Sequence, residues 1–148
     1  MPRYAVELND TTGASTTLGS IVSQTSGLRR HFIYDLVFGS EASPTDSVNL
    51  WQVARITTAG TSTGVIPKPL DLADPACSAA CGENHSGEPT YTSSEIMLSI
   101  PLNTRATFRW VAAPGSELVG PATNAAGFGF KTPTASSTAG TVTMLFSE

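Results

Sequence analysis

The sequence contains little charge and few of the residues that favour helices. Only 14% of its 148 residues are charged, well below the roughly one quarter that is usual in globular proteins. Thr, Ser and Gly are abundant, whereas Lys and Glu are scarce. Because β-branched Thr packs well on a pleated surface and Gly suits turns, this composition disfavours helices and favours strands joined by turns.

The chain also lacks clusters of positive charge and long apolar runs. It has eight basic and twelve acidic residues, for a net charge of −4, and its only adjacent basic pair is Arg29-Arg30. This balance argues against a nucleic-acid partner. No window approaches the roughly 20 apolar residues that span a bilayer, and the first residues contain no apolar signal-peptide core. We therefore expect no membrane partner and a chain made in a cytoplasm, where disulfides are uncommon.

Short apolar alternation broken by turn residues recurs along the chain, which is typical of antiparallel strands. With 148 residues, the chain is long enough for one domain with a sizeable core. We expect residues 1–148 to form a single all-β domain, an antiparallel β-sandwich or jelly-roll-like barrel of about seven to nine strands with long loops. The expected strands are 4–8, 30–40, 47–58, 93–103, 105–115, 124–133 and 140–148.

Finer expectations concern faces and connections. Period-two alternation places Phe32, Tyr34, Leu36 and Phe38 on one buried face. Residues 11–20 are expected to form a turn and loop, and 101–105 is short enough for a hairpin connection. Prolines in 63–70 predict an edge strand or a loop, because Pro cannot donate to a strand ladder. Phe128 and Phe130 share a face opposite glycines, which indicates a bulge or a close backbone approach.

The stretch "LDLADPACSAACGENHSGEPTYT", residues 70–92, concentrates the chemically reactive side chains, and we expect it to be a long connecting loop. Asp74-Pro75 is typical of a helix start, which predicts one short helical turn over 76–81. On such a turn Cys77 and Cys81 would lie with their Cβ atoms about 5–6 Å apart, farther than the about 3.8 Å of a disulfide. A helical turn therefore favours free thiols, and a disulfide would require an irregular loop.

These residues do not form a recognisable catalytic or metal motif. Cys77, Cys81 and His85 supply three ligands at a spacing that structural zinc sites do not use. Nothing in the sequence fixes His85 beside either thiol as a base. We expect no metal, no cofactor and no enzymatic activity, and we expect a loop of this length to contact a partner. The candidate contact residues are Trp51, His85 and Tyr91.

The segment from Trp51 to Phe130 resembles small proteins encoded in tailed-phage genomes. The resemblance rests on "TTAGT" at 57–61, "LDLADPA" at 70–76, "GENHSGEPTYT" at 82–92, "RATFRWVAAPG" at 105–115 and "GFGF" at 127–130. The family that it is most similar to is the cement, or decoration, proteins of tailed-phage capsids. The resemblance implies a small β-rich homotrimer on the outside of the virion, bound to the major capsid protein between capsomers. It transfers no contact residue, and it implies that the thiols are not the family's chemistry.

Two other functions remain open at this point. A host-recognition or carbohydrate-binding β-sandwich would stack an exposed aromatic such as Tyr91 or Trp51 on a sugar ring. A minor coat or tail subunit would interlock its loops and termini with those of neighbouring subunits.

Overall fold

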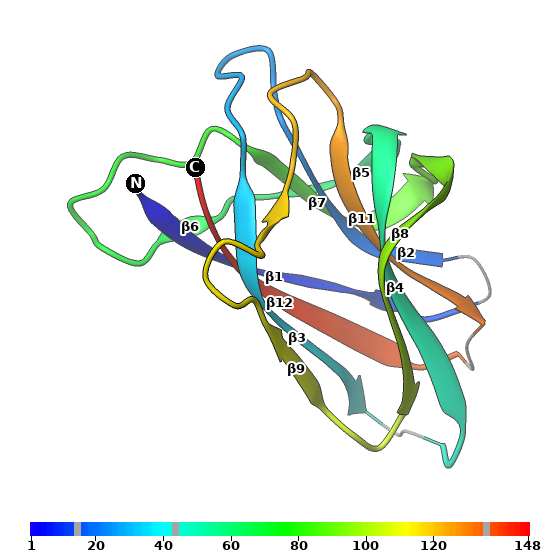
Figure 1. Cartoon of the computed structure of the whole chain (residues 1–148). Helices are drawn as coiled ribbons and strands as arrows, with labels where there is room; N and C mark the ends of the chain where they lie inside the picture. The colour runs from blue at the N-terminus through cyan, green and yellow to red at the C-terminus, as the bar shows by residue number, and fades with distance from the viewer. Residues whose placement is uncertain (14–15, 43–44, 135–136) are drawn as a thin grey trace.

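Two antiparallel sheets pack face to face to form a sandwich (Figure 1). The computed structural model describes residues 1–13, 16–42, 45–134 and 137–148, and within them it contains twelve strands and no helix. The expected all-β class and sandwich architecture are therefore confirmed, although the expected seven to nine strands were too few. Within the same residues, no helix is long and apolar enough to cross a membrane.

The first sheet holds both ends of the chain. Its path runs β10-β3-β12-β1-β6, and β9 also pairs with β3, along its free edge. The strands are β1 (Arg3–Thr11), β3 (Phe32–Ala42), β6 (Lys68–Pro69), β9 (Phe108–Val111), β10 (Leu118–Val119) and β12 (Ala139–Ser147).

The second sheet has the order β5-β7-β2-β11-β4-β8. Its strands are β2 (Thr16–Val22), β4 (Val48–Thr58), β5 (Thr61–Val65), β7 (Ala80–Gly87), β8 (Thr90–Asn103) and β11 (Gly127–Thr134). Contacts between the two sheets show which strands lie opposite each other. Phe38 of β3 packs on Trp51 of β4, with ring centroids 5.8 Å apart, and β1 lies over β2 and β7. One open edge of the sandwich is therefore formed by β8 and β9, and the other by β5 and β6.

The core lies between the sheets and follows from the alternation of apolar residues. In β12 every second residue from Gly140 is buried, so Val142, Met144 and Phe146 face the opposite sheet as expected. Phe128 and Phe130 of β11 do the same. Burying one such side chain contributes about 1.5–3 kcal/mol. The largest fully buried side chains are Tyr4, Leu8, Leu18, Ile21, Ile33, Leu36, Phe38, Trp51, Ile56, Phe128, Phe130 and Phe146.

The expected grouping of Phe32, Tyr34, Leu36 and Phe38 on one buried face of β3 is wrong because a bulge interrupts the strand. Leu145 pairs with Asp35 and Phe146 with Ile33, so Tyr34 is an additional residue in the ladder. An additional residue reverses the side-chain alternation on its far side. Ile33 therefore enters the core together with Leu36 and Phe38, whereas Phe32 and Tyr34 are only half-buried.

The expected loop over 70–92 is also wrong, because only its first part is irregular. Residues 80–87 form β7, and β8 begins at Thr90. β7 pairs with β5, and β8 pairs with β4. Residues 48–65 and 80–103 therefore form one long antiparallel ribbon, and each of its two strands has a corner. At one corner Gly60 has φ +69°, and a Cβ there would lie 2.2 Å from the Gly87 carbonyl oxygen. Cross-strand pairing therefore orders a stretch that looks turn-like in the sequence.

Two further connections differ from expectation. The central strand β2, residues 16–22 between β7 and β11, takes in half of the turn and loop expected over 11–20. Residues 101–105 do not close a hairpin, because β8 pairs with β4 and β9 pairs with β3 in the other sheet. The prolines behave as expected, since β5 and β6 are edge strands of the two sheets.

Candidate functional site

The irregular part of the suspected stretch, residues 70–79, is a turn followed by an extended crossing. The Asp74 N–H donates to the Asp71 carbonyl oxygen at 3.0 Å, and the Ala73 N–H donates to Asp71 Oδ1 at 3.0 Å. The expected helical turn over 76–81 is absent from these described residues. The Asp71 side chain caps a tight turn instead, because a short acceptor side chain can bond the backbone two residues on.

A carboxylate from the last residue holds this crossing against the sandwich. Glu148 Oε1 accepts from the Ser78 N–H at 2.6 Å, and Oε2 accepts from Ser78 Oγ at 2.9 Å and from the Ala79 N–H at 3.1 Å. Glu148 is only 9% exposed. Hydrogen bonds to an ionised acceptor are the strong ones, so the residues around the first thiol are structurally anchored.

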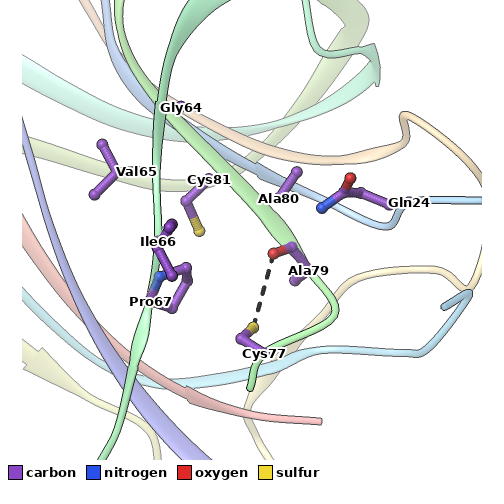
Figure 2. A pocket seen from close by; sticks show the side chains of 9 residues that line it. All are labelled: Gln24, Gly64, Val65, Ile66, Pro67, Cys77, Ala79, Ala80 and Cys81. Carbon is purple, nitrogen blue, oxygen red and sulfur yellow. Dashed lines mark hydrogen bonds between the residues drawn. The ribbon is translucent and has the colours of Figure 1, made fainter. Parts of the chain in front are cut away.

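The two thiols line one pocket of about 340 Å³ between β5, β7 and the 70–79 crossing (Figure 2). The other lining side chains are mostly apolar, including Val65, Ile66 and Pro67. Cys77 and Cys81 are both free cysteines. The alternative that the sequence left open is thereby resolved in favour of free thiols.

Neither thiol is built to react as a nucleophile. Burial and the nearby Glu148 carboxylate raise the pKa of the Cys77 thiol to about 12. Burial, the neighbouring Cys77 and Glu148 raise the pKa of the Cys81 thiol well above its ordinary value. The thiolate is the nucleophile and the metal ligand, so both groups stay protonated at neutral pH. The described residues contain no group of three or more His, Cys, Asp or Glu side chains that could hold a metal ion.

His85 and Tyr91 come together on the outer face of the second sheet, beside the corner between β7 and β8. The Tyr91 hydroxyl lies 2.7 Å from Thr17 Oγ1, which also donates to the Glu88 carboxylate. His85 Nε2 lies 3.1 Å from Ser20 Oγ. Burial raises the pKa of Tyr91 and lowers that of His85. This network fastens the corner to β2.

Tyr91 is not a free stacking platform. Lys131 Nζ lies 4.3 Å from the centre of its ring. A Cβ at Gly129 would lie 2.5 Å from the Tyr91 hydroxyl oxygen, so the glycine is needed for the ring to approach β11. The close approach expected from the glycines of β11 is confirmed, and most of the ring is already in contact with the protein.

Trp51 cannot contact a partner, which corrects its place among the candidate residues. Its side chain is 1% exposed and packs on Phe38 in the core. Arg109 of β9, whose side chain is 64% exposed, donates through its guanidinium Nε to the buried Asp35 carboxylate at 2.9 Å. The apolar and charged residues of these strands therefore stabilise the sandwich.

An ordered surface forms elsewhere, where residues 23–31 and 120–126 meet at one end of the sandwich (Figure 1). We name these two segments the loop tip. Ser23 Oγ lies 2.7 Å from the carbonyl oxygens of both Arg29 and Pro121, and its proton is shared between them. The Ala125 N–H donates to the Ser23 carbonyl oxygen at 2.9 Å, and Thr25 Oγ1 donates to Asn124 Oδ1 at 2.8 Å. The two segments therefore support each other as one unit.

The base of the loop tip contains a buried histidine. His31 is fully buried, its carbonyl oxygen accepts from the Gly120 N–H at 2.8 Å, and its ring meets Phe128 edge-on. Neither ring nitrogen has a hydrogen-bond partner within the described residues. Burial lowers the pKa of His31 to about 4, although Glu148 opposes the shift. The ring is therefore neutral at physiological pH.

The surface of the loop tip is exposed and basic. Leu28, Arg29 and Arg30 are all exposed, and Arg30 lies over the ring of Phe32 at 5.6 Å. Neither segment contains an acidic residue, in a chain whose net charge is −4. These residues form no motif in the sequence, and their one signal there is that Arg29-Arg30 is the only adjacent basic pair.

Comparisons of the chain with protein-family models, with curated proteins and with solved structures found no match.

Proposed function

We propose that this chain is a structural virion protein, a cement protein that binds the outside of a tailed-phage head between capsomers as a homotrimer. The observation that carries the proposal is the loop tip, which is ordered, exposed and positively charged. Loops held on a rigid scaffold are the usual place for binding residues. The resemblance of segments between Trp51 and Phe130 to cement proteins supplies the identity of the partner, the major capsid protein.

The proposed mechanism is mechanical. A protein that binds the assembled shell and not its free subunits shifts the equilibrium towards the intact shell by mass action. Arg29 and Arg30 would meet acidic groups of the capsid protein, and Leu28 would add apolar contact between them. Opposite charges across an interface raise the association rate and fix its orientation. Several tips in one oligomer would bind far more tightly than one, because the later contacts are intramolecular.

The direct test is co-sedimentation of the purified chain with heads of the phage that lack it. We expect the wild-type chain to sediment with the heads. We expect the double variant R29A/R30A to lose most of this binding and to become insensitive to added salt, since surface charges are screened by salt. The matched control is Arg55→Ala, which removes an exposed arginine of β4 outside the loop tip.

The outcomes separate the proposal from its alternatives. A wild-type chain that does not sediment with the heads, or equal binding by the double variant and the control, overturns it. Binding of the chain on a glycan array would favour the carbohydrate-binding alternative. The Tyr91 ring, which would stack on the sugar in that alternative, is already covered by Lys131. Tubes or shells formed by the purified chain alone would favour the minor coat or tail alternative.

A further inference from the structure

Exposed apolar side chains are concentrated on the two open edges of the sandwich. Among the described residues, most of the large apolar side chains that are exposed lie on one of these edges; Leu28 on the loop tip and Met1 beside β12 are the exceptions. The β6 edge carries Ile66, Leu70 and Leu72, and the β9 edge carries Val48, Ile96, Met97, Phe108 and Val111. Single exposed apolar residues need no explanation, but this concentration marks two surfaces suited to contact with protein.

The β6 edge is concave and apolar. It contains the thiol pocket of about 340 Å³, and Ile66 lines that pocket while being 72% exposed. Leu72 at the turn beside it is 96% exposed. Pockets lined by apolar side chains at interfaces are where partners anchor a large side chain.

The β9 edge presents side chains rather than a pocket. Met97 is the additional residue of a bulge in β8, since Ala54 pairs with Ile96 and Val53 pairs with Leu98. Leu98 and Ile100 pack only partly against the core, because β8 is the last strand of its sheet. Phe108 of β9 is 37% exposed. This edge therefore offers apolar knobs of the kind that the pocket on the other edge would accept.

Continuation of the sheet by backbone pairing does not suit this edge. Pro101 is opposite Leu50, and since Pro has no N–H the pair cannot exchange hydrogen bonds, which places the blocked nitrogen on the free side of β8. Prolines of this kind protect edge strands from pairing. A partner of this edge must contact the side chains instead.

Charge also permits the two edges to meet. Lys68 and Asp71 are exposed on the β6 edge, and Asp46 and Arg105 are exposed on the β9 edge. Each edge therefore offers a cation and an anion to the other, which would fix one relative orientation of the two surfaces.

We infer that copies of this chain associate head to tail, with the β9 edge of one copy packed on the β6 edge and thiol pocket of the next. The two surfaces lie on opposite sides of the same sandwich. A two-fold dimer formed through one edge would bury that edge in both copies and leave the other edge of both copies exposed. A closed ring of head-to-tail contacts covers both edges in every copy. The inference concerns how copies meet, and it does not depend on capsid binding.

The test uses two variants with the same added charge, Ile66→Lys on the β6 edge and Met97→Lys on the β9 edge. Both positions are exposed, so circular dichroism should show native folding. By light scattering we expect the wild-type chain to have the mass of a closed oligomer and each variant alone to be a monomer. An equimolar mixture should form a heterodimer. The unaltered β9 edge of the Ile66→Lys variant can bind the unaltered β6 edge of the Met97→Lys variant, whereas a second contact between the two altered edges would bring two lysines together.

Each other outcome overturns the inference. A monomeric wild-type chain at all concentrations excludes self-association, and a dimer of either variant alone indicates a two-fold contact through the unaltered edge. A mixture that stays monomeric shows that the two edges do not bind each other. Leu28→Lys, exposed but outside both edges, is the matched control and should keep the wild-type mass. Capsid binding is not measured here, so failure of this inference leaves capsid binding itself standing, although a monomeric wild-type chain would also remove the homotrimer from the proposed function.

Discussion

The 70–92 stretch and the loop tip contrast in what their residues suggest and in what the fold makes of them. The first contains both cysteines, a histidine and several acids, yet its thiols are protonated and His85 is bonded to β2. The second consists mainly of residues that are either small or polar, yet the structure joins two distant segments into one exposed, basic surface. In the 70–92 stretch, the reactive side chains therefore help to stabilise the fold. In the loop tip, backbone carbonyl groups and two arginines define the surface.

The comparison teaches that side-chain chemistry indicates function only together with exposure. A cysteine in an apolar pocket loses the charged form that it needs to react. An arginine on an ordered and exposed loop keeps its charge available to a partner. Four predictions test this contrast, and they are ordered by the expected change in the free energy of unfolding.

The largest effect is expected from Glu148→Ala, which removes the anchor of residues 78–79. The variant leaves two buried or half-buried backbone N–H groups without their acceptor, so the free energy of unfolding should fall by about 3 kcal/mol. Urea denaturation measures the change. Glu148→Gln keeps an acceptor oxygen and should lose less. A loss below about 1 kcal/mol for the alanine variant would show that Glu148 does not anchor the crossing.

Acid should destabilise the protein through His31 at the base of the loop tip. The folded protein keeps this ring neutral down to a pKa of about 4, whereas the unfolded chain binds a proton near 6.5. The stabilisation is therefore complete above pH 6.5 and is lost as the pH falls towards 4. Between pH 8 and pH 5 the loss attributable to His31 should be about 2 kcal/mol.

The control for this pH dependence is His31→Leu, since carboxylates and His85 also titrate as the solution is acidified. Urea denaturation of both proteins at several pH values isolates the contribution of His31 as their difference. A constant difference between pH 8 and pH 5 would contradict the assignment.

A smaller effect is expected from Ser23→Ala within the loop tip. The substitution removes the hydroxyl that lies 2.7 Å from the Arg29 and Pro121 carbonyl oxygens, and should cost about 1–2 kcal/mol. Faster amide hydrogen exchange in both segments of the loop tip should accompany it. Thr25→Ala, at an exposed bond between the same segments, is the milder control. Unchanged exchange in 120–126 would show that the segments do not support each other.

The smallest effect is expected from Cys77→Ala. The half-buried thiol donates weakly to the Ala79 carbonyl oxygen at 3.7 Å, so the free energy of unfolding should fall by less than about 1 kcal/mol. In the wild-type protein at neutral pH, both thiols should react with a thiol reagent only slowly, at a rate that rises when urea unfolds the chain. Rapid labelling of the native protein would contradict the pKa assigned to Cys77.

The strands that could be predicted are those whose alternation matches their burial. β12 and β11 were identified with their core faces because Val142, Met144 and Phe128 recur at period two. β2 was missed, because "TTLGSIV" is short, polar at its start and includes Gly19, whose missing Cβ makes room for Leu8 of β1. The faces of β3 were wrong because the additional residue Tyr34 is visible only in the pairing with β12.

Of the candidate residues, the sequence located the thiols and the region of His85 and Tyr91, but it offered Trp51 as a contact residue although its side chain is buried in the core. Period-two alternation places residues on a face without showing which face is covered. The loop tip could not be predicted, because Ser23 and Pro121 are 98 residues apart and no local pattern indicates their contact.

The sequence by itself determined the all-β class, the edge position of the proline-containing strands and the lack of a recognisable catalytic motif. These depend on local properties, namely backbone preference, side-chain alternation and the missing N–H of proline. Only the tertiary structure decided that 80–87 is a strand, that the thiols are buried and unreactive, and that a basic loop tip is exposed. Those features depend on which distant segments pair, and burial and pKa follow from that pairing.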